Sequence, residues 1–195
     1  MKSLSRNWRR MFADRRGLAA TEFAFIMPVM LVMFFGTVEF SSGVAVDRKV
    51  TLMARTLSDV TSQSVSVTDS DLAGFFLAAN WIMWPYATTT PNPYPASPLS
   101  GTITELFVDP TTLQARVQWS KGTAPRATSS TVAIPSALAI GGSYLIFSEV
   151  SYTYVPTVGY VMAKAGITLS DFAYTRPRQS DCVLYNPPTP PCPKL

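Results

Sequence analysis

The sequence contains no histidine and only two cysteines, Cys182 and Cys192, among its 195 residues. Histidine is the usual general base and a common zinc ligand, so its absence removes Ser–His and Cys–His nucleophile pairs and most zinc sites. No close carboxylate pair and no nucleophile elbow replaces it. We therefore expect a protein that is not an enzyme and that holds no metal, cofactor or small-molecule substrate.

Positive charge is scarce after the first 17 residues. Residues 1–17 carry a net charge of +5 and residues 18–195 a net charge of −1, which together give the formal charge of +4. A nucleic-acid interface needs a basic patch that follows the phosphate backbone, and the sequence has none beyond this leader. We expect no nucleic-acid partner and regard residues 1–17 as a basic cytoplasmic leader.

One apolar run of membrane length follows the leader. Residues 23–38 contain no charge, and the wider run 18–38 contains Glu22 as its only charge. At about 1.5 Å per helical residue, the wider run can span a hydrocarbon core of about 30 Å. The positive-inside rule keeps the leader in the cytoplasm and exports the rest. We therefore expect a single-pass protein of the bacterial inner membrane with a periplasmic C-terminal domain.

Three interpretations of residues 1–46 compete. A secretory signal peptide would be cleaved near residues 43–45, and a simple anchor would stay uncleaved. A pilin-like precursor would be cleaved after Gly17, which leaves Leu18 as the new N-terminus and Glu22 as the fifth residue. A carboxylate at a bilayer centre costs about 3 kcal/mol, which argues against a signal peptide with Glu22 in its apolar run.

Helical periodicity continues beyond the membrane run. Apolar residues recur at intervals of three and four, which predicts one long helix from Leu18 to about Val60. We expect residues 18–42 to form the transmembrane helix and residues 43–60 an amphipathic extension. Pro28 should bend the span rather than break it. The expected packing stripe consists of Phe40, Gly43, Val46, Val50, Met53, Leu57 and Val60.

Residues 61–195 predict an α+β head. A possible N-cap run at residues 68–71 precedes a short helix, and a Pro-rich loop covers residues 85–98. The expected strands are 102–108, 113–120, 144–155 and 167–175. Strict alternation in the second of these predicts an antiparallel hairpin with one wet face, which would carry Gln114, Arg116, Gln118 and Ser120. The fold class is thus a transmembrane helix, continued as an amphipathic helix, on a small antiparallel β-sheet.

Other residues of the head leave alternatives open. Trp81, Trp84 and Tyr86 form either caps of the core or an adhesive surface. Cys182 and Cys192 either close the loop 182–192 by a disulfide in an oxidising compartment or remain reduced thiols.

Two groups of residues together resemble the TadE/TadG-like minor pilins or pseudopilins of the tight-adherence (Flp, type IVb) pilus system. The first is Gly17-Leu18-Ala19-Ala20-Thr21-Glu22-Phe23-Ala24, with Pro28 and Gly36 later in the span. The second consists of Ile134-Pro135, the Glu-Val-Ser-Tyr-x-Tyr segment at residues 149–154, and Arg-Pro-Arg at residues 176–178. Joined together, these motifs extend over most of the chain.

The resemblance implies a processing site for a prepilin peptidase between Gly17 and Leu18. It implies that Glu22 pairs with the exposed N-terminal amine of a neighbouring subunit, so that other Tad/Flp pilins and pilus assembly proteins are the partners. It also suggests a structural or docking role for Arg176 and Arg178. The alternative is an exported envelope adhesin or binding module with a cleaved or uncleaved signal anchor.

Overall fold

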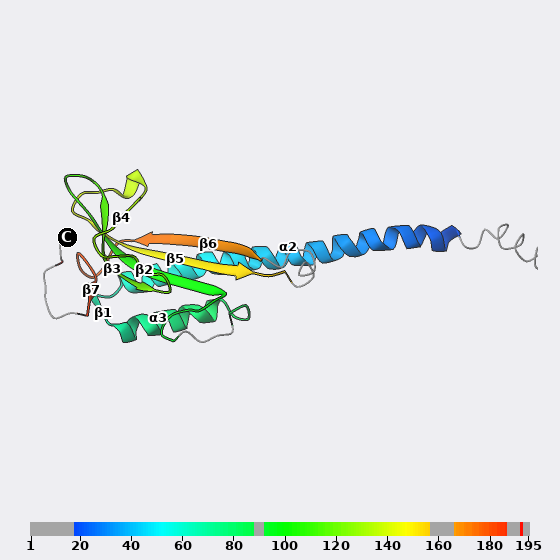
Figure 1. The fold of residues 1–195 in the computed structure, drawn as a ribbon, viewed down its shortest axis with the longest axis horizontal. Helices are drawn as coiled ribbons and strands as arrows, with labels where there is room; N and C mark the ends of the chain where they lie inside the picture. Colours follow the sequence, from blue (N-terminus) through cyan, green and yellow to red (C-terminus); the bar gives the residue numbers. More distant parts are fainter. Residues whose placement is uncertain (1–17, 88–91, 157–165, 187–191, 193–195) are drawn as a thin grey trace, which may run out of the picture. The chain divides into compact units, whose positions relative to one another are not determined.

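The computed structural model describes residues 18–87, 92–156, 166–186 and 192 (Figure 1). Contacts within the chain divide it into two compact units, one ending at Ser42 and the other comprising Gly43–Leu195. Gly17, one half of the expected processing site, lies outside the described residues.

The first described element is the long helix α2, Leu18–Ser62. Its bounds confirm the predicted long helix, which ends two residues later than expected. Pro28 lies inside α2 without ending it, although a proline at that position removes one backbone hydrogen bond of the helix. At the C-terminal end of α2, Ser62 Oγ donates a hydrogen bond to the carbonyl of Asp59 at 2.7 Å.

Within the second unit, α2 buries one stripe of apolar side chains. Val46, Val50, Met53 and Leu57 are all at most 1% exposed. The prediction was wrong at Phe40, whose side chain is 75% exposed. Phe40 belongs to the first unit, whereas the strands that bury the stripe belong to the second, so periodicity alone placed the start of the stripe too early.

The short helix α3, Asp69–Ile82, confirms the predicted helix after the polar run. Thr68 is its N-cap, and a capping box joins Thr68 to Asp71: the Asp71 N–H donates to Thr68 Oγ1, and the Thr68 N–H donates to Asp71 Oδ2. Two otherwise unsatisfied N–H groups are thereby bonded at the helix start.

The central sheet has five strands in the order β4-β3-β2-β5-β6, and all its pairs are antiparallel. This confirms the α+β fold class. The strand that opens the sheet starts three residues before the predicted Thr102, since Leu99 already pairs with Tyr152. The strands are β2 (Leu99–Val108), β3 (Ala115–Gly122), β4 (Thr131–Val132), β5 (Tyr144–Tyr154) and β6 (Ile167–Thr175).

The hairpin β2–β3 is antiparallel as predicted, and Gln114 is exposed as expected, but the expected wet face is wrong at Gln118 and Ser120. Gln118 and Ser120 are only 6% and 9% exposed. The pairing shifts at Glu105/Leu106, so that Trp119 and Val117 face consecutive residues of β2. This β-bulge inserts Gln118 as an extra residue and interrupts the simple alternation.

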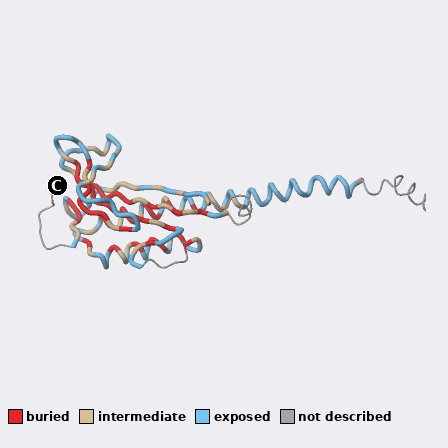
Figure 2. The backbone as a smooth tube through the Cα atoms, viewed as in Figure 1, coloured by how far each residue is buried: buried red, intermediate tan, exposed pale blue. Residues whose placement is uncertain are grey.

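Both faces of the sheet are covered, as Figure 2 shows by the buried colour along the central strands. On one face, α2 and α3 pack against a core that includes Ile103, Trp119 and Ile146. On the other, Val117 joins a second cluster that is covered by residues after β3. The side chains packed on it are Val132, Ile134, Leu138 and Tyr174; Leu138 lies in the 3₁₀ helix η2 (Ser136–Leu138) and Tyr174 in β6.

A second, two-stranded sheet joins distant parts of the head. The strand β1 (Ser66–Val67) pairs in parallel with β7 (Leu184–Tyr185). Thr61 and Ser62 belong to α2 and residues 66–67 to β1, so only residues 63–65 connect the two elements. Strands of two residues carry no periodicity, so only tertiary contacts define them.

Candidate assembly site

The first part of α2 is apolar on every side. Every residue from Ala19 to Val38 is exposed within the chain, as the uniform pale blue of this segment shows in Figure 2. The helix includes an 18-residue window of mean hydropathy 2.0, of which 0% is buried. A helix that is hydrophobic all round needs an apolar environment. This helix is therefore long and apolar enough to cross a membrane.

Glu22 is the one charged residue in this exposed apolar segment. It lies four residues after Leu18, the first residue of α2, so the two positions share a face of the helix one turn apart. Pro28 is also exposed, further along α2. The structure thus places Leu18, Glu22 and Pro28 on one helix, whereas Gly17 lies outside the described residues.

Arg178 connects the C-terminal part of the head to α2. Its backbone N–H donates to the Ser62 carbonyl at 2.8 Å, and its guanidinium forms an ion pair with Asp59. Arg176, two residues earlier, is exposed. Of the two arginines for which we expect docking, Arg178 therefore already has a carboxylate partner within its own chain.

The Glu-Val-Ser-Tyr-x-Tyr segment forms part of β5 and holds several elements together. Just before it, Ser148 is fully buried and donates from Oγ to the Ala54 carbonyl of α2 at 2.6 Å. Tyr152 donates from its hydroxyl to the Tyr86 carbonyl at 3.0 Å. Tyr154 is only 8% exposed. The segment that resembles a family motif therefore has a structural role in the head.

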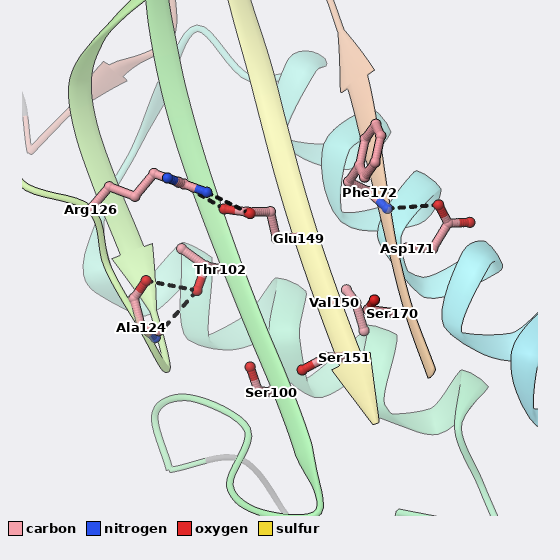
Figure 3. A pocket seen from close by; sticks show the side chains of 10 residues that line it. All are labelled: Ser100, Thr102, Ala124, Arg126, Glu149, Val150, Ser151, Ser170, Asp171 and Phe172. Carbon is pink, nitrogen blue, oxygen red and sulfur yellow. Dashed lines mark hydrogen bonds and ion pairs between the residues drawn. The ribbon is translucent and has the colours of Figure 1, made fainter. Parts of the chain in front are cut away.

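A shallow polar groove of about 390 Å³ lies on the sheet beside Glu149 (Figure 3). Arg126 crosses it and binds Glu149 with two hydrogen bonds, Nε to Oε2 at 2.9 Å and Nη2 to Oε1 at 2.6 Å. The Arg126 guanidinium also lies 5.6 Å from the centre of the Phe147 ring. Arg126 and Glu149 are thus engaged with each other.

Glu105 is a buried carboxylate that the sequence analysis missed. Its side chain is 1% exposed, and Oε1 accepts a hydrogen bond from the Val183 N–H at 2.6 Å. Trp119 Nε1 donates to the Val183 carbonyl at 2.8 Å. Burial raises the pKa of Glu105 to about 8, although the hydrogen bonds from Val183 and Trp119 oppose the shift. Its position between Ile103 and Phe107 in strand alternation was the available signal.

The segment held by Glu105 also carries a disulfide. Cys182 and Cys192 are bonded, with their Cα atoms 5.7 Å apart. Cys182 is buried in a small cluster with Phe107 and Tyr144. Of the two alternatives for these cysteines, the structure has the oxidised one.

Trp81 and Trp84 do not cap the core. Their side chains are 66% and 59% exposed, whereas Tyr86 is half-buried against the core. Lys49 of α2 binds the C-terminal end of α3: its Nζ donates to the carbonyls of Ile82 at 2.7 Å and Trp84 at 3.1 Å. Two exposed tryptophans therefore lie at the C-terminal end of α3.

The described residues contain no group of three or more His, Cys, Asp or Glu side chains placed to hold a metal ion.

No curated protein and no solved structure matches the chain. Residues 17–57 match the model of the TadE-like protein family. This match covers the membrane run with Glu22 and most of the remainder of α2. Residues 17–57 are therefore similar to the TadE-like protein family.

Proposed function

We propose that this chain is a membrane-anchored minor pilin or pseudopilin that supports assembly of a tight-adherence pilus. The observation that carries the proposal is the lone carboxylate Glu22, four residues after Leu18 in an otherwise uncharged and fully exposed helical segment. The TadE-like match over residues 17–57 supports the same system.

The proposed chemistry begins with cleavage between Gly17 and Leu18 by a prepilin peptidase. Hydrolysis of that peptide bond leaves an α-amino group on Leu18, whose ordinary pKa of about 7.7–8.0 makes it largely cationic at neutral pH. The leader, which carries the net charge of +5, is lost with this step. The processed helix then begins with an ammonium group at Leu18, and Glu22 lies one turn further on.

Pairing across subunits explains why the carboxylate lies there. A carboxylate and an ammonium group in a low-dielectric environment each carry a large desolvation cost, and a close pair offsets much of it. Glu22 of this chain would bind the N-terminal amine of a neighbouring pilin and thereby select one docking register. The pair favours an assembled bundle over a lone span, because the ammonium group that Glu22 binds belongs to a second subunit.

The head would lie in the periplasm, with α2 anchored in the inner membrane and the basic leader initially cytoplasmic. Other pilins and pilus assembly proteins are the proposed partners. The disulfide Cys182–Cys192 fits an oxidising compartment. The chain's role is structural, and the proposal includes no catalytic step.

Substitution of Glu22 tests the pairing. Glu22→Ala should still yield protein that begins at Leu18, but incorporation into the assembled pilus should fall to background. A matched control exchanges Thr21 and Glu22, which keeps the composition but turns the carboxylate by about 100° around the helix. The exchange should fail to incorporate as well. Normal recovery of either variant in sheared pili would contradict the role of Glu22.

One observation favours a second candidate, an exported adhesin or binding module. Trp81 and Trp84 are largely exposed, and residues 72–104 contain no charged residue. The N-terminal residue of the isolated protein separates the candidates. Leu18 supports the pilin, a residue from 44 to 46 supports a secreted module, and Met1 supports an uncleaved anchor.

A further inference from the structure

The strand β6 is an open edge of the central sheet. It pairs with β5 on one side, and no strand among the described residues pairs with its other side. Figure 1 shows β6 in orange as the outermost long strand. Its sequence of nine residues contains one charge, Asp171, and neither lysine nor proline. Natural edge strands usually carry such residues because a bare edge is a template for pairing.

The strand register identifies which backbone groups face outward. Thr153 of β5 donates its N–H to the Pro98 carbonyl at 2.9 Å, on the β2 side. Thr168 lies opposite Thr153, and opposed residues of an antiparallel pair turn their backbone groups either toward or away from each other. Thr168 and every second residue after it therefore point away from the sheet. In agreement, the Phe172 N–H donates to Asp171 Oδ1 at 2.8 Å, outside the ladder (Figure 3).

A groove of about 530 Å³ runs beside this edge. One wall consists of Arg55, Thr56 and Asp59 of α2, and the other of residues 172–175 of β6. Asp59 is paired with Arg178. Arg55 is exposed and takes part in none of the ion pairs among the described residues. The guanidinium of Arg55 is thus available to a ligand that binds along β6.

The side chains of Phe172 and Tyr174 make the face of β6 away from α2 aromatic, because Tyr174 packs on the second cluster, whereas Ala173 packs on the core under α2. Phe172 is 58% exposed, and its ring centre lies 5.7 Å from that of Tyr174. Tyr174 in turn stacks on Phe147 of β5, with ring centres 4.6 Å apart. Successive side chains of a strand added to β6 would alternate between the Arg55 wall and this aromatic face.

We propose that the β6 edge binds an extended segment of another subunit of the pilus system, acidic on the side that faces Arg55 and apolar on the side that faces Phe172. Backbone hydrogen bonds to the outward groups of β6 supply affinity, and the alternating side chains supply specificity. Asp171 competes with the incoming strand for the Phe172 N–H. The inference rests on the proposed function, which supplies the neighbouring subunit.

Hydrogen exchange of the full-length protein in lipid nanodiscs tests the edge directly. The probe is a peptide of about seven residues that alternates glutamate and valine, compared with one that alternates lysine and valine. The acidic peptide should slow exchange at the outward amides of Ser170 and Tyr174 about tenfold, and the basic peptide should not. No slowing with either peptide, or equal slowing with both, would overturn the proposal.

Arg55→Glu should reverse the preference between the two peptides, whereas the matched control Arg48→Glu, on α2 outside the groove, should keep it. If Arg55→Glu still bound the acidic peptide in preference to the basic one, the proposed acidic partner segment would be contradicted.

Ser170→Pro removes an outward N–H without removing a bond to β5, and Ser170→Ala keeps that N–H. In cells, only the proline variant should lose pili, at unchanged protein level and Tm. If the two Ser170 variants formed equal amounts of pili while Glu22→Ala formed none, the proposed binding at the β6 edge would be refuted and the proposed function would stand. Dimers of this chain cross-linked through β6 would instead make a second copy the occupant.

Discussion

Replacing Glu105 with glutamine should remove most of the pH dependence of the head's stability. Glu105 is 1% exposed, and its Oε1 accepts the Val183 N–H at 2.6 Å. Glutamine retains a side-chain oxygen that can accept the Val183 N–H, and it cannot ionise. The substitution therefore separates the effect of charge from the effect of the hydrogen bond.

The sign follows from the direction of the shift. Burial raises the pKa of Glu105 from its ordinary 4.5 to about 8. Between these values the unfolded chain has lost the proton while the folded chain keeps it, so the folded state binds more protons. The contribution of Glu105 to stability is therefore greatest below pH 4.5 and falls as the pH rises toward 8. At about 1.36 kcal/mol per tenfold change in proton affinity, the loss is about 5 kcal/mol.

Thermal unfolding of the full-length protein in nanodiscs measures this effect. For a unit of this size, about 1 kcal/mol shifts Tm by about 2–4 °C, so wild type should lose about 10–20 °C between pH 5 and pH 9 relative to Glu105→Gln. The two proteins should have similar Tm at pH 5. Parallel Tm profiles over the whole range would refute the assignment of a neutral, buried Glu105.

Three smaller predictions concern the remaining supports of the head. Thr68→Ala removes the N-cap of α3 and should lower the free energy of unfolding by about 1 kcal/mol, whereas Thr68→Ser should retain most of it. Ser148→Ala leaves the Ala54 carbonyl without its buried donor and should cost about 1–3 kcal/mol by denaturant titration. Reduction of Cys182–Cys192 should cost at most about 2–3 kcal/mol, because the loop is short. An unchanged unfolding midpoint in Thr68→Ala or Ser148→Ala, or a loss well above about 3 kcal/mol on reduction, would contradict the corresponding contact.

Local patterns predicted the elements that are fixed by local chemistry. The three- and four-residue periodicity of α2 gave its length within two residues, and the polar run before Leu72 marked the start of α3. The strand β6 has the predicted bounds, Ile167–Thr175, because an apolar run there ends at Arg-Pro-Arg. These signals depend on residues close together in sequence.

Features that depend on distant partners could not be predicted in the same way. The bulge at Gln118 is set by pairing with β2, and the sequence of β3 alone reads as unbroken alternation. The strand β1 exists only because β7, more than a hundred residues later, pairs with it. Alternation places Glu105 on the same strand face as Ile103 and Phe107, but its hydrogen-bond partner Val183 lies 78 residues later in the chain. Likewise, Trp81 and Trp84 could be distinguished from core caps only by their exposure.

Intact-mass and N-terminal analysis of the protein recovered from sheared pili and from the membrane fraction tests the central claim most directly. The account predicts a processed chain that begins at Leu18 and therefore lacks the 17-residue basic leader. A chain that begins at Met1, or at any residue from 44 to 46, would contradict it.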